Sequence, residues 1–302
     1  MRSYALAVVC AAVAGAAVVS AAGSGARGAA GSTTRVPSPV SITSAPVQTA
    51  NTRLGRVAYR TTGSGPPLLL IIGYRGIMEH WEPRLVDALA RQHRVITFDN
   101  AGVGRTQAVR APLTIDAMAD QTSALIGALH LGRTDVLGWS MGGMIAQALA
   151  VRHASQVRRL VLCATSPGDG MAVRPSRREL DEFDLAVLFP AGHTAAENAF
   201  LAGISSYPAA PDVPAATVAA QRHALDAWWS GKDPAGKKTA TIAVPTLIAD
   251  GTEDKLAPIA NSRELAKLIP NAKLQLYSGA GHAFLFQDQA TFLPLVESFL
   301  GG

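Results

Sequence analysis

The chain of 302 residues is predicted to be an α/β protein, with a mostly parallel eight-stranded sheet and helices on both faces. Short apolar runs, which suit strands buried on both faces, alternate with segments of helical periodicity. The alternation stops once, over a stretch of helical patterns, and then resumes. The hydrophobic fraction of 48% and the charged fraction of 16% supply enough apolar material for a large core.

The elements expected before the interruption alternate in type. A short β pair is predicted at 46–51 and 56–63, and the strands of the buried part of the sheet are predicted at 67–73, 94–100, 133–139 and 157–166. Helices are predicted between these strands, at 80–92, 114–132 and 141–153. Thr114 is the expected N-cap of the second helix, and Gly132 is its expected end.

Residues 169–241 are expected to form a helical cap, inserted after the sixth strand of the sheet. Pro and Gly separate its helical stretches, and no apolar strand interrupts them. The earlier pattern resumes with a strand at 245–251, a helix at 261–270, a strand from 272 and a last helix at 292–300. The whole α/β domain is placed at 46–302.

The N-terminus has the pattern of an export signal. A basic start precedes 19 uncharged residues, Tyr4 to Ala22, which end in small side chains suited to cleavage. We therefore predict a signal peptide at 1–22, a flexible linker at 23–45, and a protein that is secreted or associated with the cell envelope. An uncleaved anchor is the alternative, because 19 residues can span a bilayer.

Several function classes are not expected. The net charge is +5, but no dense Lys/Arg block with interleaved aromatic residues is present, so nucleic-acid binding is not predicted. No His-x-x-x-His or Cys-x-x-Cys pair indicates a metal. The stretch Gly231–Lys238 imitates a phosphate-binding loop, but Lys238 stands where Ser or Thr is required. Loss of Cys10 with the leader leaves Cys163 alone, as a packed thiol without a disulfide partner.

We predict no cofactor, a small-molecule substrate and no stable membrane insertion of the mature chain. The oligomeric state is left open.

A serine lies between two glycines at a predicted strand-to-helix corner. Ser140 follows the strand at 133–139, with Gly138 and Gly142 two residues away on either side. Small flanking residues relieve crowding in such a turn, and the hydroxyl then projects at the carboxyl edge of the sheet. The helix that follows directs its N-terminal N–H groups at the reacting atom. The context therefore predicts a nucleophile.

A serine nucleophile needs a base, and the base needs an orienting acid. Of the seven histidines, only His282 follows a predicted sheet strand, in a glycine-rich loop at the same edge as the serine. Asp254, three residues past the end of the strand at 245–251, is the preferred acid. The other candidates for the acid are Asp250, Glu253 and Asp169.

These residues resemble the α/β-hydrolase family of the capped type, over about residues 46–300. The order of nucleophile, acid and base along the chain is that of the family. The stretch "FDNAGVGRT", residues 98–106, is similar to the family's Asp-x-x-Gly-x-Gly-x-Ser/Thr loop. The family's Gly-x-x-Asp-x-x-x-Pro turn is matched by Gly251, Asp254 and Pro258. The resemblance implies a covalent acyl-enzyme and a cap that shapes the substrate site.

The loop after the strand at 67–73 departs from the family, which usually has His-Gly-x where this chain has Ile72-Gly73-Tyr74. By position, the backbone N–H groups of Tyr74 and Met141 are expected to form the oxyanion hole. Main-chain donors do not depend on the missing histidine, although the conformation of the loop does.

An apolar substrate pocket is expected beside the nucleophile. One of the adjoining cap residues Trp228 and Trp229 is a candidate wall, since both cannot face inward on one helix; packing of the cap on the main domain is the alternative. Met144 and Phe284 are further candidates because they lie close in sequence to the nucleophile and the base. Such walls favour uncharged, apolar acyl or alcohol groups.

The sequence thus predicts an exported serine hydrolase that cleaves carboxylic esters of small to medium apolar substrates. One alternative is a lyase, a carbon–carbon bond hydrolase or a cofactor-free perhydrolase or haloperoxidase-like enzyme that uses the same triad. A second alternative is a non-catalytic ligand-binding protein on the hydrolase scaffold. Fold alone does not decide among them.

Overall fold

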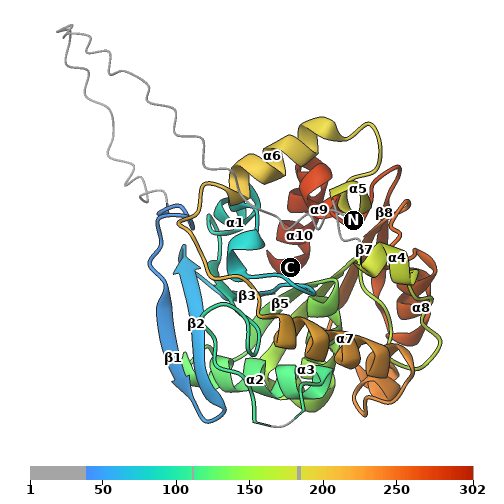
Figure 1. The fold of residues 1–302 in the computed structure, drawn as a ribbon, viewed down its shortest axis with the longest axis horizontal. Coiled ribbons are helices and arrows are strands. Elements are labelled where there is room, and N and C mark those ends of the chain that lie inside the picture. Colours follow the sequence, from blue (N-terminus) through green and yellow to red (C-terminus); the bar gives the residue numbers. More distant parts are fainter. Residues whose placement is uncertain (1–38, 111, 182–184, 302) are drawn as a thin grey trace, which may run out of the picture. The chain divides into compact units, whose positions relative to one another are not determined.

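A computed structural model describes residues 39–110, 112–181 and 185–301. Within these residues, eight strands form one sheet in the order β1-β2-β4-β3-β5-β6-β7-β8 (Figure 1). The strands are β1 Gln48–Thr52, β2 Gly55–Thr62, β3 Pro67–Ile71, β4 Arg94–Phe98, β5 Thr134–Trp139, β6 Val157–Cys163, β7 Thr246–Gly251 and β8 Lys273–Tyr277. β2 is antiparallel to both β1 and β4, and all other neighbours are parallel. The predicted eight-stranded, mostly parallel sheet is confirmed.

The burial of each strand follows from its place in the sheet. Every residue of β5 and β7 is buried, whereas the edge strand β8 alternates between exposed and partly buried residues before it ends at the buried Tyr277. Continuous burial is expected of central parallel strands, because helices cover both of their faces. This covering explains the apolar runs in the sequence. Cys163, at the end of β6, is fully buried, as expected of a packed thiol.

The helices divide between the two faces because the direction of the crossovers reverses. β3 leads through α1, Pro83–Leu89, to β4 on one side, whereas β5 leads through α3, Met141–Arg152, to β6 on the other. Right-handed crossovers in opposite directions place their helices on opposite faces. α2, Ile115–Ala128, packs against α3, and α10, Gln289–Gly301, packs against α1. The remaining elements of the main domain are η1 Met78–His80, η2 Ala154–Gln156, α8 Ala260–Leu268 and α9 Phe284–Gln287.

The predicted boundaries of α2 are partly confirmed. The side chain of Thr114 caps the helix, since its Oγ1 accepts from the backbone N–H of Ala117 at 3.0 Å. The helix ends at Ala128, four residues before the expected end at Gly132. His130 already has a positive φ of 51°.

The described elements between β6 and β7 are all helical. They are α4 Arg177–Asp181, α5 Leu185–Leu188, α6 Thr194–Ile204, α7 Ala215–Trp229 and η3 Gly236–Thr241. Tyr207 donates to the carbonyl of Trp81 after β3, and Thr217 donates to the carbonyl of Gly102 after β4. The insertion therefore contacts loops at the carboxyl edge of the sheet.

The segment before β1 is part of the folded domain, so the linker predicted at 23–45 ends earlier than expected. The described compact unit begins at Pro39. Ile42 is fully buried, and its N–H donates to Asp87 of α1 at 2.8 Å. The hydroxyl of Ser41 donates to the same carboxylate at 2.7 Å. The composition of small and polar residues suggested a tether, but this carboxylate and the core hold the end of the segment in place.

The signal peptide predicted at 1–22 lies outside the described residues.

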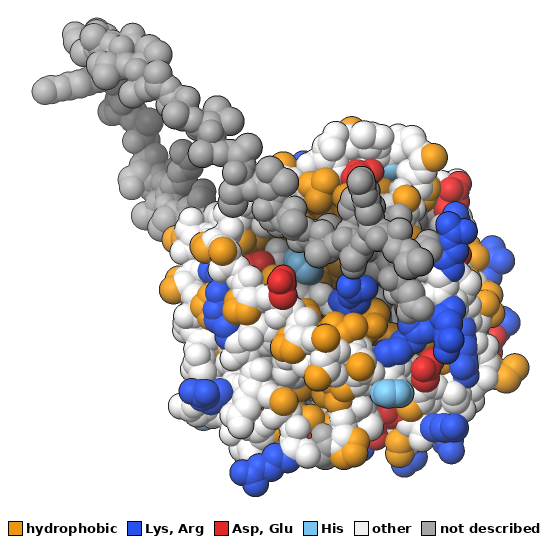
Figure 2. All heavy atoms as spheres, in the orientation of Figure 1, with side chains coloured by type: hydrophobic (Ala, Val, Ile, Leu, Met, Phe, Trp, Pro, Cys, Tyr) orange, Lys and Arg blue, Asp and Glu red, His pale blue; other side chains and the backbone are white. Residues whose placement is uncertain are grey.

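The surface of the described residues mixes residue types. Large hydrophobic side chains are exposed at Val40, Met171 and Val173. On the face in Figure 2, hydrophobic side chains are interspersed with polar and charged ones. Among the described residues, we find no helix with both the length and the apolar character that a membrane span requires.

Candidate active site

Ser140 occupies a strained turn between β5 and α3. Its backbone has φ 60° and ψ −125°, a conformation that costs a non-glycine residue of order 1–3 kcal/mol. The N–H of Ser140 donates to the carbonyl of Cys163, at the end of β6, at 2.9 Å. Ser140 remains partly exposed although β5 is buried throughout. The predicted corner is therefore present, and it places Ser140 at the carboxyl edge of the sheet.

The glycines around Ser140 are required by close backbone contacts. A Cβ on Gly138 would clash with the carbonyl of Gly142, and a Cβ on Gly142 would clash with the carbonyl of Ile71 in β3. Side chains at these two positions would push α3 away from the sheet. Steric necessity thus explains both glycines that flank the serine in the sequence.

Asp254 and His282 form a buried ion pair at the same edge. Nδ1 of His282 donates to Oδ2 of Asp254 at 2.7 Å, and both side chains are almost completely shielded from solvent. Oδ1 of Asp254 accepts from the N–H groups of Leu256 and Ala257 at 2.7 and 2.8 Å. Burial alone raises the pKa of Asp254, but the charge and hydrogen bond of His282 together with the N–H of Ala257 hold it below its usual value. Asp254 is therefore a carboxylate that fixes the imidazole through Nδ1.

Trp139 links the turn at Ser140 to the loop at His282. Its indole N–H donates to the carbonyl of His282 at 2.9 Å, and the two rings lie 5.6 Å apart. Because Trp139 directly precedes Ser140, this contact brings the loop of the candidate base beside the candidate nucleophile. The structure thus brings Ser140, Asp254 and His282 to one edge from the ends of β5, β7 and β8.

Asp250, the first alternative for the acid, has a different set of contacts. It is fully buried and accepts from the hydroxyl of Ser262 and from the N–H of Gly251. Burial, and then the nearby charge of Asp254, raise the pKa of Asp250 well above its ordinary value. Asp250 is therefore a buried neighbour of Asp254 that does not ionise readily.

The remaining alternatives for the acid, Asp169 and Glu253, have other surroundings. Asp169 accepts from the N–H of Met171 in its own loop, and Glu253 is exposed. Among the four candidates, Asp254 is the one with a hydrogen bond to His282. Within the described residues, no group of three or more His, Cys, Asp or Glu side chains is arranged to hold a metal ion.

The loop that carries Tyr74 runs beside the nucleophile. A Cβ on Gly73 would lie 2.8 Å from the Cβ of Ser140 and 3.3 Å from its Oγ. The main chain just before Tyr74 is thus within a few ångströms of the reacting hydroxyl, which is where a donor of an oxyanion hole has to be.

Contacts from two sides hold this loop without the histidine that the family has. Ile72, which stands at the position of that histidine, is buried. Asn100 donates from its side-chain amide to the carbonyl of Ile72 at 3.0 Å. The N–H of Arg75 donates to Oε1 of Gln221 in α7 at 3.1 Å. The loop is therefore fixed by a strand-end residue on one side and by the cap on the other.

Trp228 and Trp229 pack the cap on the main domain, which was the alternative to a role in a pocket wall. Both indoles are buried, and both reach the same residue after β6: Trp228 donates to the carbonyl of Ser166 at 3.1 Å, and Trp229 to its Oγ at 2.9 Å. We expected that only one of two adjoining residues on a helix would face inward, and this was wrong. Because α7 ends at Trp229, the helix can direct both rings at the main domain.

The other two candidate pocket residues are also part of the core. Met144 is buried on α3. Phe284 is fully buried and stacks on Tyr277 at 5.0 Å, with Phe292 at 5.4 Å. A role of Met144 or Phe284 as a pocket wall stays a prediction.

Asn100 and Gln221, which hold the loop of Tyr74, were not among the site residues expected from the sequence. Asn100 lies inside the glycine-rich stretch after β4, where its position at a strand end was a usable signal. Gln221 is a buried polar residue in the middle of a cap helix, and its contact spans 146 residues of sequence. Nothing local in the sequence indicated that contact.

Comparison with known proteins establishes the family. The model of the alpha/beta hydrolase fold matches residues 66–188 and 213–289, which include Ser140, Asp254 and His282. The chain therefore belongs to the α/β-hydrolase fold family, a family of hydrolase enzymes. The unmatched residues between these two ranges fall within the helical insertion.

The relatives are named for different substrates. A putative carbamate hydrolase of Caulobacter sp. (strain K31) is 29% identical over 78% of this chain and 90% of its own length. The 2-hydroxymuconate semialdehyde hydrolase of Pseudomonas sp. (strain CF600) is 31% identical over 81% of this chain and 90% of its own length. Among solved structures, the enol-lactonase from Burkholderia xenovorans LB400 superposes with a TM-score of 0.68, at 26% identity over 84% of this chain and 100% of that one. The family is thus shared across several kinds of hydrolase.

Proposed function

We propose that this chain is a serine hydrolase that cleaves carboxylic esters of small to medium apolar substrates through Ser140, His282 and Asp254. One observation carries the proposal: a serine in a strained strand-to-helix turn lies beside the loop of a buried, Asp-paired histidine. A serine hydroxyl is a weak nucleophile at neutral pH, and a paired imidazole is the group that activates it.

The mechanism follows from the protonation of the pair. With Nδ1–H bound to Asp254, Nε2 of His282 is the basic nitrogen that takes the proton of Ser140 as Oγ attacks the ester carbonyl. The N–H groups of Tyr74 and Met141 stabilise the oxyanion, since the main chain before Tyr74 runs beside the serine and Met141 begins α3. His282 then protonates the leaving alcohol and activates a water molecule that hydrolyses the acyl-enzyme.

One comparison favours an ester as the substrate, and the surroundings of His282 favour an apolar one. The solved enol-lactonase, which shares the fold at 26% identity, has a name that denotes a cyclic ester as its substrate. The ring of Trp139 lies 5.6 Å from that of His282, and Phe286 packs on Trp139, so the surroundings of the proposed base are apolar and favour a neutral substrate. A charged substrate that binds as well as a neutral one of equal size contradicts this preference.

The proposal includes export, which rests on the signal-like sequence of residues 1–22. Expression of the full chain in a bacterial host, followed by N-terminal sequencing of the enzyme outside the cytoplasm, tests this part. Cleavage after Ser20, Ala21 or Ala22 supports it, and an intact N-terminus in the membrane fraction favours the anchor.

The activity itself is tested with p-nitrophenyl esters of increasing acyl length and with a fluorophosphonate label, on wild type beside Ser140→Ala. Turnover and labelling that vanish in the variant support Ser140 as nucleophile, and the optimal acyl length measures the pocket. Labelling without turnover of any ester rejects the ester substrate and retains the nucleophile. Carbamate and 2-hydroxymuconate semialdehyde substrates, suggested by the two relatives, are then the next to assay.

A further inference from the structure

The loop after β6 contacts both the turn at Ser140 and the last helix of the cap. It consists of Ala164, Thr165 and Ser166, all of which are buried. None of these three residues has a role in the mechanism above. The inference drawn from this loop rests on the proposed role of Ser140 as nucleophile.

Thr165 holds the carbonyl of Ser140. Its Oγ1 donates to that oxygen at 2.8 Å, and the N–H of Gly143 donates to the same oxygen at 2.9 Å. Since the N–H of Ser140 donates to the carbonyl of Cys163, both peptide groups of the strained residue are fixed from the end of β6. Contacts that over-determine a residue in this way keep it in a sparsely populated backbone conformation.

The close packing around Thr165 leaves little freedom for its hydroxyl. A Cβ on Gly143 would lie 2.7 Å from the side chain of Thr165, so only glycine fits at that position of α3. Ala164 has a positive φ of 48°, uncommon for alanine, and its N–H donates to the carbonyl of Ala249 in β7 at 2.9 Å. The backbone of this loop is thus turned sharply at the point where it directs Thr165 at Ser140.

Ser166 is held by the cap. Its carbonyl accepts from Trp228 and from Gln147 of α3, each at 3.1 Å, and its Oγ accepts from Trp229 at 2.9 Å. A buried serine with three donors from two helices has a fixed position. Thr165 and Ser166 are adjacent, so the position of the end of α7 constrains Thr165 through one peptide unit.

We propose that Thr165 is a positioning residue for the nucleophile Ser140, and that its own position is set by the two tryptophans at the end of α7 through Ser166. The placement of the cap and the reactivity of the serine are thereby coupled. The coupling needs no movement of a lid. It requires only that the end of α7 and the turn at Ser140 hold the same loop.

Thr165→Val tests the first part, since it keeps the shape and removes the hydroxyl. We expect the rate constant of fluorophosphonate labelling, and kcat for a p-nitrophenyl ester, to fall about 10- to 100-fold with KM unchanged, because small misplacements of a nucleophile have effects of that size. Thr165→Ser should restore both. Thr122→Val is the matched control: Thr122 is also buried and donates to a backbone carbonyl, that of Met118 in α2, at 2.8 Å.

The control should label and turn over ester at the wild-type rate with a similar loss of thermal stability. Equal labelling rates for wild type and Thr165→Val overturn the positioning role. If Thr165→Val does not fold, Thr165→Ala takes its place: slow labelling that Thr165→Ser restores supports the role, and labelling of Thr165→Ala at the wild-type rate overturns it.

Trp229→Phe tests the coupling, since it keeps an aromatic ring and removes the N–H bound to Ser166. We expect a labelling rate about 2- to 5-fold slower, and no further slowing when the change is combined with Thr165→Val, as for residues that act through one contact. Multiplicative effects of the two substitutions overturn the coupling.

Labelling also separates this inference from the proposed function, because it requires only a reactive serine. Labelled wild type that turns over no ester refutes the ester substrate alone. Unlabelled wild type refutes both.

Discussion

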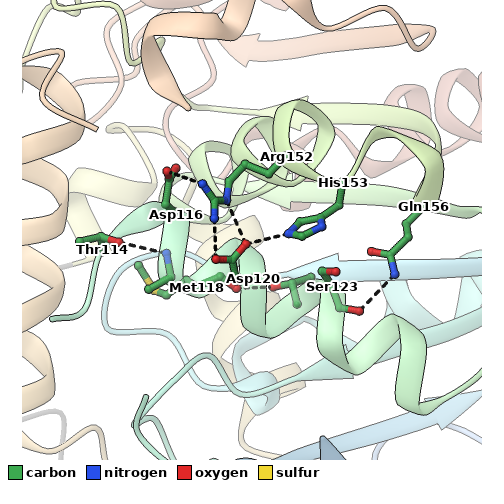
Figure 3. Close-up of polar contacts among 10 residues, drawn as sticks. Thr114, Asp116, Met118, Asp120, Ser123, Arg152, His153 and Gln156 are labelled. Atoms are coloured by element: carbon green, nitrogen blue, oxygen red, sulfur yellow. Dashed lines mark hydrogen bonds and ion pairs between the residues drawn. The ribbon is translucent and has the colours of Figure 1, made fainter. Parts of the chain in front are cut away.

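Two aspartate–histidine pairs in the described part of the chain have the same 2.7 Å contact and very different surroundings. His282 uses Nδ1 toward Asp254, and both side chains are at most 2% exposed. His153 uses Nε2 toward Asp120, with side chains 24% and 27% exposed. Figure 3 shows that Asp120 also binds Arg152. The second pair is one part of a surface ion-pair network between α2 and α3.

The difference lies in which ring nitrogen the carboxylate occupies and in what else lies nearby. With Nδ1 occupied, Nε2 of His282 is left for the role of base that we propose, and the loop of His282 is bound to the residue before Ser140. With Nε2 occupied, His153 lies just after the last residue of α3, at the opposite end of that helix from Ser140. A short Asp–His distance is therefore not sufficient to identify a catalytic base.

Removal of each imidazole is the strongest test of this comparison. His282→Gln should lower kcat/KM for an ester about 10⁴-fold, because the general base is lost. His153→Gln should leave kcat/KM unchanged and lower the melting temperature slightly. Steady-state kinetics and thermal unfolding of both variants check this. Comparable losses of activity would make His153 part of the machinery and break the distinction.

Neutralisation of each carboxylate should give the next largest contrast. Asp254→Asn is expected to lower kcat about 10³-fold or more, because an amide no longer selects the tautomer that leaves Nε2 basic. Asp120→Asn makes the same substitution in the exposed pair, and the kcat of that variant should stay within about 2-fold of wild type. The measurement is the turnover of one ester at neutral pH. An active Asp254→Asn enzyme would transfer the role of the acid to another carboxylate.

The pH dependence of stability should depend on Asp233, which is buried beside Asp116, a partner of Arg152 in the surface network. Burial, and then the Asp116 carboxyl, raise the pKa of Asp233 from 3.8 to about 7. The folded protein therefore holds this proton more tightly than the unfolded chain does. The stabilisation is fully present below the ordinary pKa of an aspartate and is lost as the pH rises to about 7.

Asp233→Asn keeps a neutral side chain at every pH. From pH 5 to pH 8 the wild type should lose about 2 kcal/mol of unfolding free energy relative to this variant, after allowance for screening by nearby water. Urea unfolding at several pH values measures the difference. Parallel pH profiles for the two proteins would show that Asp233 titrates normally.

The smallest expected effect is the stability contribution of Asp120. Burial raises the pKa of Asp120, but the hydrogen bonds and charges of Arg152 and His153 outweigh it and lower the pKa below its ordinary value. Its contribution is thus present above the ordinary pKa of an aspartate and is lost as the pH falls through the lowered value. Asp120→Asn should lose less than about 1 kcal/mol at pH 7, and the difference should shrink as urea unfolding is repeated toward acid pH. A constant difference would assign the effect to packing rather than to charge.

Much of the fold could be predicted from the sequence because burial on both faces leaves a plain signature in parallel strands. All eight strands fall where apolar runs or a β pair were expected. Asp254 was predictable because it lies three residues after the end of β7, which the sequence marks clearly. The turn that follows the strand brings the Asp254 carboxylate to His282.

What could not be predicted depends on contacts between distant residues. The two tryptophans of α7 both face Ser166 because the helix ends there, which periodicity does not reveal. Residues 39–45 are held by the burial of Ile42 and by hydrogen bonds to Asp87, Arg60 and Thr62, whereas composition indicated a tether. Met144 and Phe284 are close to the triad in sequence, but such closeness does not tell a pocket wall from a core residue.

The attachment of Ser41 and Ile42 to Asp87 sets a limit on processing of the chain. Any protease that releases the domain intact has to cut before residue 41. A cut after residue 42 or later removes the buried side chain of Ile42 and leaves Asp87 without both of its donors from this segment. A recombinant form that begins at residue 46 would accordingly be a weakened protein rather than a trimmed one. The residue at which a shortened protein begins thus affects stability in the same way as a substitution in the core.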